Sequence, residues 1–234
     1  MLRTTLLLLT VALAGCGSAP PYYSFTQDLP AHAALSIRTT GTINAYKPAI
    51  GQDRMLLTLE PSGPPAAIPS PRLARAGDAY SYAIDYGTSL LARIPDGVVL
   101  DVASSGGDVN VTDINGPATA YARAGDVKVM VPGYAQASAG AGNVTVFMGA
   151  TTWPGTLKFG TGTGDVEVWI NATAHFNVRM HTDRGTIFDD FGLTGTSKGD
   201  AETIVGTVGG ATGGGIDIEV RDGSIRLLQL KPQV

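Results

Sequence analysis

A short motif, Gly-Asp/Asn-Val-x-Val, recurs along this chain and constrains what the chain can fold into. Close and looser copies begin at seven glycines: Gly41, Gly107, Gly125, Gly142, Gly164, Gly185 and Gly223. From Gly107 to Gly185 the glycines are spaced by 18, 17, 22 and 21 residues. A repeat near 20 residues in fixed phase is typical of stacked β architectures, in which each unit buries its apolar face against its neighbours.

Apolar and polar residues alternate within the motif. In the copy at Gly125, for example, Val127 and Val129 flank Lys128. A second alternating segment, residues 118–122, precedes this glycine, and the other close copies have equivalents. A period of two predicts strands with one buried and one solvated face, so we expect Val127 to point inward and Lys128 outward.

The Gly-Asp and Gly-Asn pairs between these strands are predicted to be corners. Glycine allows a positive φ, and an Asp or Asn side chain can bond to nearby backbone. The predicted structural corner residues are Gly107, Asp108, Gly125, Asp126, Gly142, Asn143, Gly164, Asp165 and Gly223. An alternative for the three aspartates is a stacked column that binds a cation, although we predict no metal site.

Two all-β architectures fit the repeat. The preferred one is a single-domain, β-helix-like solenoid of about seven stacked repeats, because near-identical residues recur in one phase and alanine rows suit a narrow interior. The alternative is an antiparallel sandwich in which each Gly-Asp pair is a hairpin turn. The predicted domain spans residues 31–234. It comprises an irregular first coil with a Pro-rich loop (31–94), regular coils (95–190) and C-terminal closing coils (191–234).

The N-terminus reads as a secretion signal over residues 1–15. Arg3 provides a positive charge, and the apolar run at 4–12 is too short to span a bilayer. Leu13-Ala14-Gly15-Cys16 resembles the lipobox of bacterial lipoproteins, and Cys16 is the only cysteine. The resemblance implies cleavage before Cys16, a diacylglyceryl anchor on its thiol and a lipidated tether over 16–30. An ordinary signal peptide with an incidental cysteine is the alternative.

Composition and charge narrow the possible partners. The formal net charge is −4, which does not favour nucleic acid or an anionic membrane surface. The predicted bilayer contact is the acyl group on Cys16, and no other cofactor is expected. Gly17 follows Cys16 where an Asp would be a retention signal, so the lipoprotein resemblance implies the outer membrane. Which side of that membrane the chain faces is left open.

The sequence lacks Ser-x-x-Lys, His-Glu-x-x-His and a Gly-Lys-Ser/Thr phosphate loop. The spacing Gly-x-Ser-x-Gly occurs once, at residues 195–199, and a pentapeptide alone does not define a hydrolase site. We therefore predict no catalytic residues. The enzymatic alternative is a carbohydrate-active β-helix enzyme, of the polysaccharide lyase or hydrolase type, that uses Asp183 and Arg184 with Asp189 and Asp190. Calcium binding by these aspartates is a further alternative.

Four side chains are weak candidates for surface binding. His175 and His181 share one face of an alternating strand with Arg179 between them. Trp153 and Trp169, together with Tyr121, alternate with polar residues and would offer rings for stacking against a sugar or a protein partner if they lie outside. The alternative for the histidines is a solvated polar face. The alternative for the aromatic residues is packing in the core or at its edge.

The motif copies, the Pro-Gly corners and the C-terminal GIDIEVRDGSIRL resemble the bacterial "putative adhesin" β-strand-repeat family, a domain of unknown function. The resemblance covers about residues 35–230 and implies a β-helix-like fold in a cell-envelope setting. We therefore expect a non-enzymatic envelope lipoprotein that presents a stacked β surface for adhesion or scaffolding, to an unknown protein or glycan partner.

Overall fold

The computed structural model describes residues 24–30, 32–48, 56–61, 72–84 and 89–230, which form 21 strands and no helix. The ten strands of sheet A are, in spatial order, β1 (Phe25–Asp28), β4 (Leu56–Pro61), β7 (Leu90–Arg93), β3 (Ile43–Tyr46), β9 (Val109–Thr112), β11 (Val127–Val131), β13 (Val144–Met148), β15 (Val166–Asn171), β21 (Ile225–Leu230) and β17 (Ile187–Asp189).

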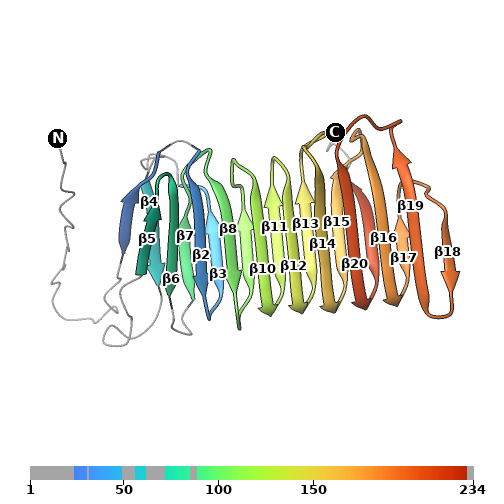
Figure 1. Ribbon diagram of the computed structural model, residues 1–234, viewed down its shortest axis with the longest axis horizontal. Coiled ribbons are helices and arrows are strands. Elements are labelled where there is room, and N and C mark those ends of the chain that lie inside the picture. Colours follow the sequence, from blue (N-terminus) through green and yellow to red (C-terminus); the bar gives the residue numbers. More distant parts are fainter. Residues whose placement is uncertain (1–23, 31, 49–55, 62–71, 85–88, 231–234) are drawn as a thin grey trace, which may run out of the picture.

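The eleven strands of sheet B are, in spatial order, β18 (Gly195–Lys198), β19 (Ala201–Val208), β16 (Phe176–Arg184), β20 (Gly215–Asp222), β14 (Thr156–Thr163), β12 (Ala135–Ala141), β10 (Ala118–Ala124), β8 (Val99–Ser104), β2 (Ala34–Thr39), β6 (Ala79–Ile84) and β5 (Arg72–Ala76). The strands follow one another along the long axis of the molecule (Figure 1). The predicted all-β class is confirmed.

In the middle of the molecule the chain alternates between the sheets. From β8 to β15 every even-numbered strand belongs to sheet B and every odd-numbered strand to sheet A. Neighbours within each sheet run parallel, and Val127, for example, pairs in register with Val109 and Val144. The strands on either side of a Gly-Asp corner therefore lie in different sheets. In this region the corners are not hairpin turns.

The motif copies are also neighbours in space. The strands that follow their seven glycines are β3, β9, β11, β13, β15, β21 and β17, which occupy consecutive places in sheet A. A parallel sheet of this kind keeps equivalent residues in rows, because pairing without a register shift puts each motif position beside the same position of the next copy.

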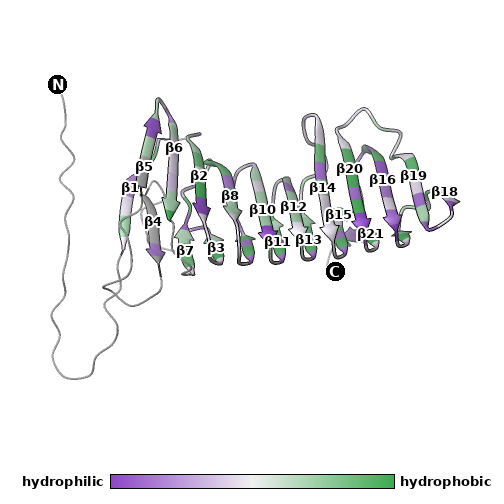
Figure 2. Cartoon of the chain, turned by 60° about the horizontal axis from the view of Figure 1, so that its bottom comes forward, coloured by the Kyte–Doolittle hydropathy of each residue, from purple (hydrophilic) through white to green (hydrophobic). Residues whose placement is uncertain are grey.

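The core lies between the two sheets, and its residues follow the predicted alternation. Val127 and Val129 are 1% and 0% exposed, while Lys128 between them is exposed. Ala118, Ala120, Ala122 and their equivalents Ala135, Ala137 and Ala139 form the facing side in the narrow central part. Figure 2 shows the same alternation of hydropathy along strands such as β16 and β20. Burial of each valine stabilises the fold by roughly 1.5–3 kcal/mol.

The strand order at both ends differs from the order of the chain. Strands β2 and β3 lie inside the sheets, beside β8 and β9, and β20 and β21 are inserted between β14 and β16 and between β15 and β17. The prediction that the residues after 191 close the end of the stack is therefore wrong for β20 and β21. The outermost strands at that end are β17 and β18.

The pairing becomes antiparallel at the ends. β5 pairs with β6, β4 with β1 and β7, and β19 with β16 and β18, all antiparallel. A row of unpaired backbone groups at a sheet edge invites association, and short edge strands such as β17 and β18 limit it.

Several predicted features lie outside the described residues. These are the signal peptide at 1–15, Cys16, the first part of the tether at 16–30 and the Pro-rich segment at 62–71. Within the described part of the chain, no helix has the length and apolar character needed to cross a membrane.

Candidate functional site

The corner glycines form a tightly stacked column. Gly125, Gly142 and Gly164 have φ values of +142°, +138° and +129°. A Cβ added to Gly125 would lie 2.6 Å from the carbonyl oxygen of Gly107, and one added to Gly142 would lie 2.1 Å from that of Gly125. Residues other than glycine rarely adopt this backbone conformation, and the neighbouring corner also leaves no space for a side chain here.

The Asp and Asn residues after these glycines form a second column. The backbone N–H of Asp126 donates to Asp108 Oδ1 (2.9 Å), Asn143 to Asp126 Oδ1 (2.7 Å), Asp165 to Asn143 Oδ1 (3.0 Å) and Ser224 to Asp165 Oδ1 (2.8 Å). Each side chain thus holds the next corner. Among the described residues, no three His, Cys, Asp or Glu side chains are grouped to hold a metal ion. The hydrogen bonds between successive corners account for this column.

Trp153 is a core residue. Its side chain is 5% exposed, its Nε1–H donates to the carbonyl oxygen of Gly215 (2.9 Å), and its ring packs 5.6 Å from that of Phe176. The possibility that Trp153 offers a surface ring for binding is therefore wrong. Trp153 lies in the loop between β13 and β14, outside the strands in which alternation separates buried from exposed residues.

Trp169 lies on the outer face of sheet A, where Phe147 covers one face of its ring. It stacks on Phe147 with centroids 5.7 Å apart and planes inclined by 11°, and Leu228 is its register partner in β21. Its Nε1–H donates to Glu167 Oε1 (2.7 Å). Such in-register pairs stabilise sheets, and this one occupies one face of the indole that a sugar would need.

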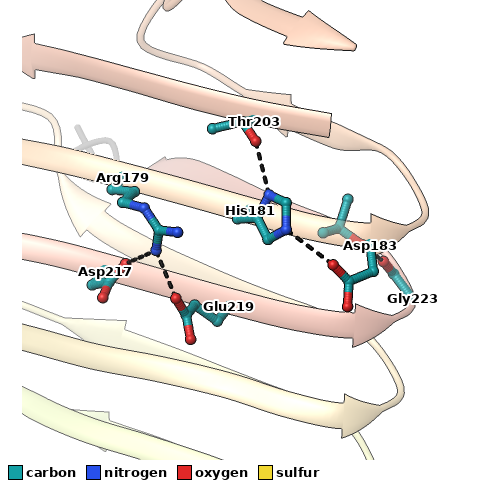
Figure 3. A network of polar contacts seen from close by, with 8 residues as sticks. Arg179, His181, Asp183, Thr203, Asp217, Glu219 and Gly223 are labelled. Carbon is teal, nitrogen blue, oxygen red and sulfur yellow. Dashed lines mark hydrogen bonds and ion pairs between the residues drawn. The ribbon is translucent and has the colours of Figure 1, made fainter. Parts of the chain in front are cut away.

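The two histidines are at the surface, His175 just before β16 and His181 within it, but they do not converge. His175 Nδ1 lies 2.5 Å from the carbonyl oxygen of Gly209. His181 contacts Thr203 Oγ1 through Nδ1 (2.8 Å) and Asp183 Oδ1 through Nε2 (3.0 Å), as Figure 3 shows. The rings lie on either side of Arg179 and have different partners, so they do not form a joint site.

Arg179 joins β16 to β20 on the outer face of sheet B. Its Nη1 donates to Glu219 Oε1 (2.6 Å) and Asp217 Oδ1 (2.9 Å), in the network of Figure 3. Hydrogen bonds to Glu219, and next to Asp217, raise the pKa of the Arg179 guanidinium. Sequence reasoning missed this network because β20 was expected at the end of the stack, not beside β16.

The acidic residues of the enzymatic alternative have separate partners. Asp189 Oδ1 accepts hydrogen bonds from the backbone N–H groups of Phe191 and Leu193 (2.9 and 3.0 Å). Asp190 Oδ2 accepts one from the backbone of Gln229 (3.1 Å). These contacts hold turns and strand ends, and they do not assemble a catalytic pair of carboxylates with Asp183.

Arg184, the cation of that alternative, binds elsewhere. Its Nη2 lies 2.8 Å from Asp222 Oδ2, and the hydrogen bond to this carboxylate raises the pKa of the guanidinium. Arg184 and Asp222 are register partners on β16 and β20, so the pair ties two strands together at the exposed surface.

A shallow groove of about 550 Å³ crosses the outer face of sheet B. It runs over β10, β12, β14, β20 and β16, and its lining includes Thr119, Gln136, Ser138, Lys158, Gly160, His181, Asp183, Glu219 and Arg221. The hollow arises because Ser138 and its register partner Gly160 are small, while longer side chains surround them. The network of Figure 3 forms one side of the groove through His181, Asp183 and Glu219.

Only some of the charged side chains around this groove have a bonded partner. Glu219 forms an ion pair with Arg179, and Asp183 is the hydrogen-bond partner of His181. In the described part of the chain, by contrast, neither Lys158 nor Arg221 forms an ion pair; the guanidinium of Arg221 lies over β14, where a Cβ added to Gly162 would be 3.0 Å from its Nη2. The groove therefore presents two cations without an ion pair of their own, and Asp217, the register partner of Lys158, is bound to Arg179.

Comparison with known proteins gives two structural similarities. One is to a "putative cell adhesion protein" from Clostridium sporogenes, with 10% identity, a TM-score of 0.49 and coverage of 89% of this chain and 100% of the other. The second is to a "putative adhesin" from Bacteroides fragilis, with 11% identity, a TM-score of 0.36 and coverage of 92% and 100%. No protein-family model and no curated protein sequence matches the chain.

Proposed function

We propose that this chain is a non-enzymatic, lipid-anchored β-solenoid of the cell envelope that binds a partner through the outer face of sheet B. The observation that carries the proposal is the groove on this face, with its unpaired cations Lys158 and Arg221. The outer surfaces of the two sheets differ, since the aromatic and polar side chains of sheet A form in-register pairs such as Phe147 with Trp169.

The stacked architecture supports a binding role. Equivalent side chains of parallel strands stay in rows, so the groove is held by strands that are paired on both sides. A rigid sheet presents its surface without the ordering cost that a flexible loop incurs on binding. The acidic residues of the enzymatic alternative have structural partners, which also favours binding over catalysis.

The lipid anchor on Cys16 is the second part of the proposal. It is supported by the lipobox-like segment before the only cysteine of the chain. More than one acyl chain is needed for stable membrane attachment, which a lipoprotein-type modification provides. Expression of the native chain and of Cys16→Ser in cells fed a clickable fatty acid tests it. We expect label and outer-membrane fractionation for the native chain alone; a labelled Cys16→Ser would contradict the anchor.

Protease treatment of intact cells separates adhesion from scaffolding. Degradation of the native protein on intact cells would support an adhesin exposed at the surface. Protection until the outer membrane is opened would support a periplasmic scaffold. The non-enzymatic part is tested separately, since turnover of any polymer in a panel of polysaccharides by the purified full-length protein would overturn it.

A further inference from the structure

We infer that the groove on sheet B binds the carboxylate groups of an extended acidic polysaccharide. The inference rests on the proposed binding role of this face and names the chemical class of its ligand. Three features of the groove point to it: two separated cations, acidic neighbours with contacts of their own, and a floor of small residues that also carries hydroxyl and amide groups.

The two cations are placed for a chain with several carboxylates. Lys158 is on β14, and Arg221 of β20 lies over Gly162, four residues further along β14. Four strand residues span roughly 13 Å, which is too far for one carboxylate to bridge at its ends. Two charged units of a single extended polymer, bound along β14, satisfy both cations.

The attraction between the groove and an anion comes from the side chains of the groove itself. The chain as a whole carries a formal net charge of −4, so its overall field does not attract polyanions. Arg179 engages Glu219 and His181 engages Asp183, so these acidic side chains have partners other than the two cations. An anion that enters the groove meets Lys158 and Arg221 directly, and contacts of this kind give specificity more than raw affinity.

The floor of the groove favours a sugar over a peptide. Thr119, Gln136 and Ser138 offer hydroxyl and amide groups, and Gly160 leaves room for a ring to approach the backbone. The strands beneath are internal to the sheet, with both edges already paired. An extended peptide therefore cannot add a strand here, which is how peptides commonly bind to sheets.

The test is calorimetric titration of the full-length protein in detergent micelles with tetragalacturonate and with its fully methyl-esterified form. We expect binding of the free acid that weakens with added salt, and no binding of the ester. Lys158→Gln and Arg221→Gln should each weaken binding about three- to ten-fold, as exposed charge contacts do. Lys128→Gln, an exposed lysine on the outer face of sheet A, is the matched control and should change nothing.

A second variant fills the groove without removing charge. Ser138→Phe places a ring beside Gly160 on the outer face, where an aromatic next to a glycine stabilises a sheet. We expect it to abolish binding while the melting temperature stays the same or rises. Unchanged binding in Ser138→Phe, or equal binding of acid and ester, would overturn the inference.

The remaining outcomes separate the inference from the proposed function. Tighter binding of a tetraglutamate peptide than of tetragalacturonate would overturn the saccharide assignment. Binding followed by cleavage of the oligosaccharide would support the site but overturn the non-enzymatic function. No binding by a protein that is still lipidated at Cys16 would overturn the inference and leave the anchored role standing.

Discussion

The pentapeptide Ala-Arg-Ala-Gly-Asp occurs twice in this chain and folds in two ways. At residues 74–78 it forms the end of β5 and the turn of the antiparallel hairpin to β6. At residues 122–126 it is a corner that takes the chain from β10 in sheet B to β11 in sheet A. Both glycines have positive φ, at +61° for Gly77 and +142° for Gly125.

The difference between the two copies lies in their neighbours. Gly125 is stacked against Gly107, whereas a Cβ added to Gly77 would meet nothing within 4 Å. Arg123 Nε donates to the carbonyl of Ser105 in the preceding repeat, and Arg75 Nε donates to Gly77 within its own turn. Five identical residues therefore permit both conformations, and the repeats stacked on either side select one. Local sequence and global fold must agree before a motif defines a structure.

The largest expected difference in stability between the two pentapeptides concerns the residue that follows each of them. Val127 is 1% exposed, and Ala79 is exposed. Val127→Asp puts an unpaired charge between the sheets and should destabilise the fold by roughly 3–5 kcal/mol. Ala79→Asp and Lys128→Asp should each cost less than about 1 kcal/mol. Denaturant unfolding of the three variants measures this, and equal midpoints would mean that the inward and outward assignments are wrong.

The glycines themselves give the next contrast. Gly125→Ala combines an unfavourable φ with a Cβ 2.6 Å from the Gly107 carbonyl, and should cost roughly 2–4 kcal/mol. Gly77→Ala meets open space and incurs only the left-handed backbone penalty of about 1–2 kcal/mol. Thermal melts of the two variants compare them directly. A larger loss in Gly77→Ala would show that stacking does not set the cost at Gly125.

The sequence predicts the regular part of this fold well because its information there is local. The period of two fixed which residues are buried, from Val109 to Val168, and the repeat placed the motif copies side by side. The ends were harder to predict. Whether β20 and β21 cap the stack or enter it depends on pairing with strands about 40 residues away, as between Arg179 and Asp217, and periodicity contains no such information.

The candidate site depends on the same long-range pairing. Arg221 reaches Gly162 only because β20 is the neighbour of β14, and Glu219 reaches Arg179 only because β16 lies on its other side. His181 and its outward direction were predictable from alternation along β16, whereas its contacts with Asp183 and Thr203 were not. Trp153 shows the converse, because it is buried in the loop between β13 and β14, where alternation along a strand does not apply.

The aspartates of the two pentapeptides give a smaller contrast. Asp126 Oδ1 accepts hydrogen bonds from the backbone N–H and the side-chain Nδ2 of Asn143 (2.7 and 3.3 Å), while the Asp78 carboxylate lies at an exposed turn. Asp126→Ala leaves the Asn143 amide without this acceptor and should cost about 1–2 kcal/mol. Asp78→Ala should stay within about 0.5 kcal/mol.

Asp126→Asn is the matched variant for this column. It retains a side-chain oxygen acceptor and should recover most of the stability, because Asn143 already fills the same role one repeat further on. Urea unfolding of the native protein, Asp126→Ala, Asp126→Asn and Asp78→Ala shows whether Asp126 stabilises the fold through its hydrogen bonds or through its charge. A loss in Asp126→Asn as large as in Asp126→Ala would point to the negative charge instead.

The smallest effect concerns a buried tyrosine in the strand after the hairpin turn. Burial, and next the charge of Tyr80, raise the pKa of Tyr82 from 10.0 to about 12. Because the folded-state pKa is the higher one, the fold favours the protonated phenol, and this contribution to stability is complete below pH 10 and is lost between pH 10 and 12. The absorbance change at 295 nm should include a late step that disappears in Tyr82→Phe. The late step should persist in Gly77→Ala at 25 °C, because the open surroundings of Gly77 tolerate a side chain. Loss of the step in this variant would show that the hairpin depends on Gly77 as closely as the stacked corners depend on Gly125.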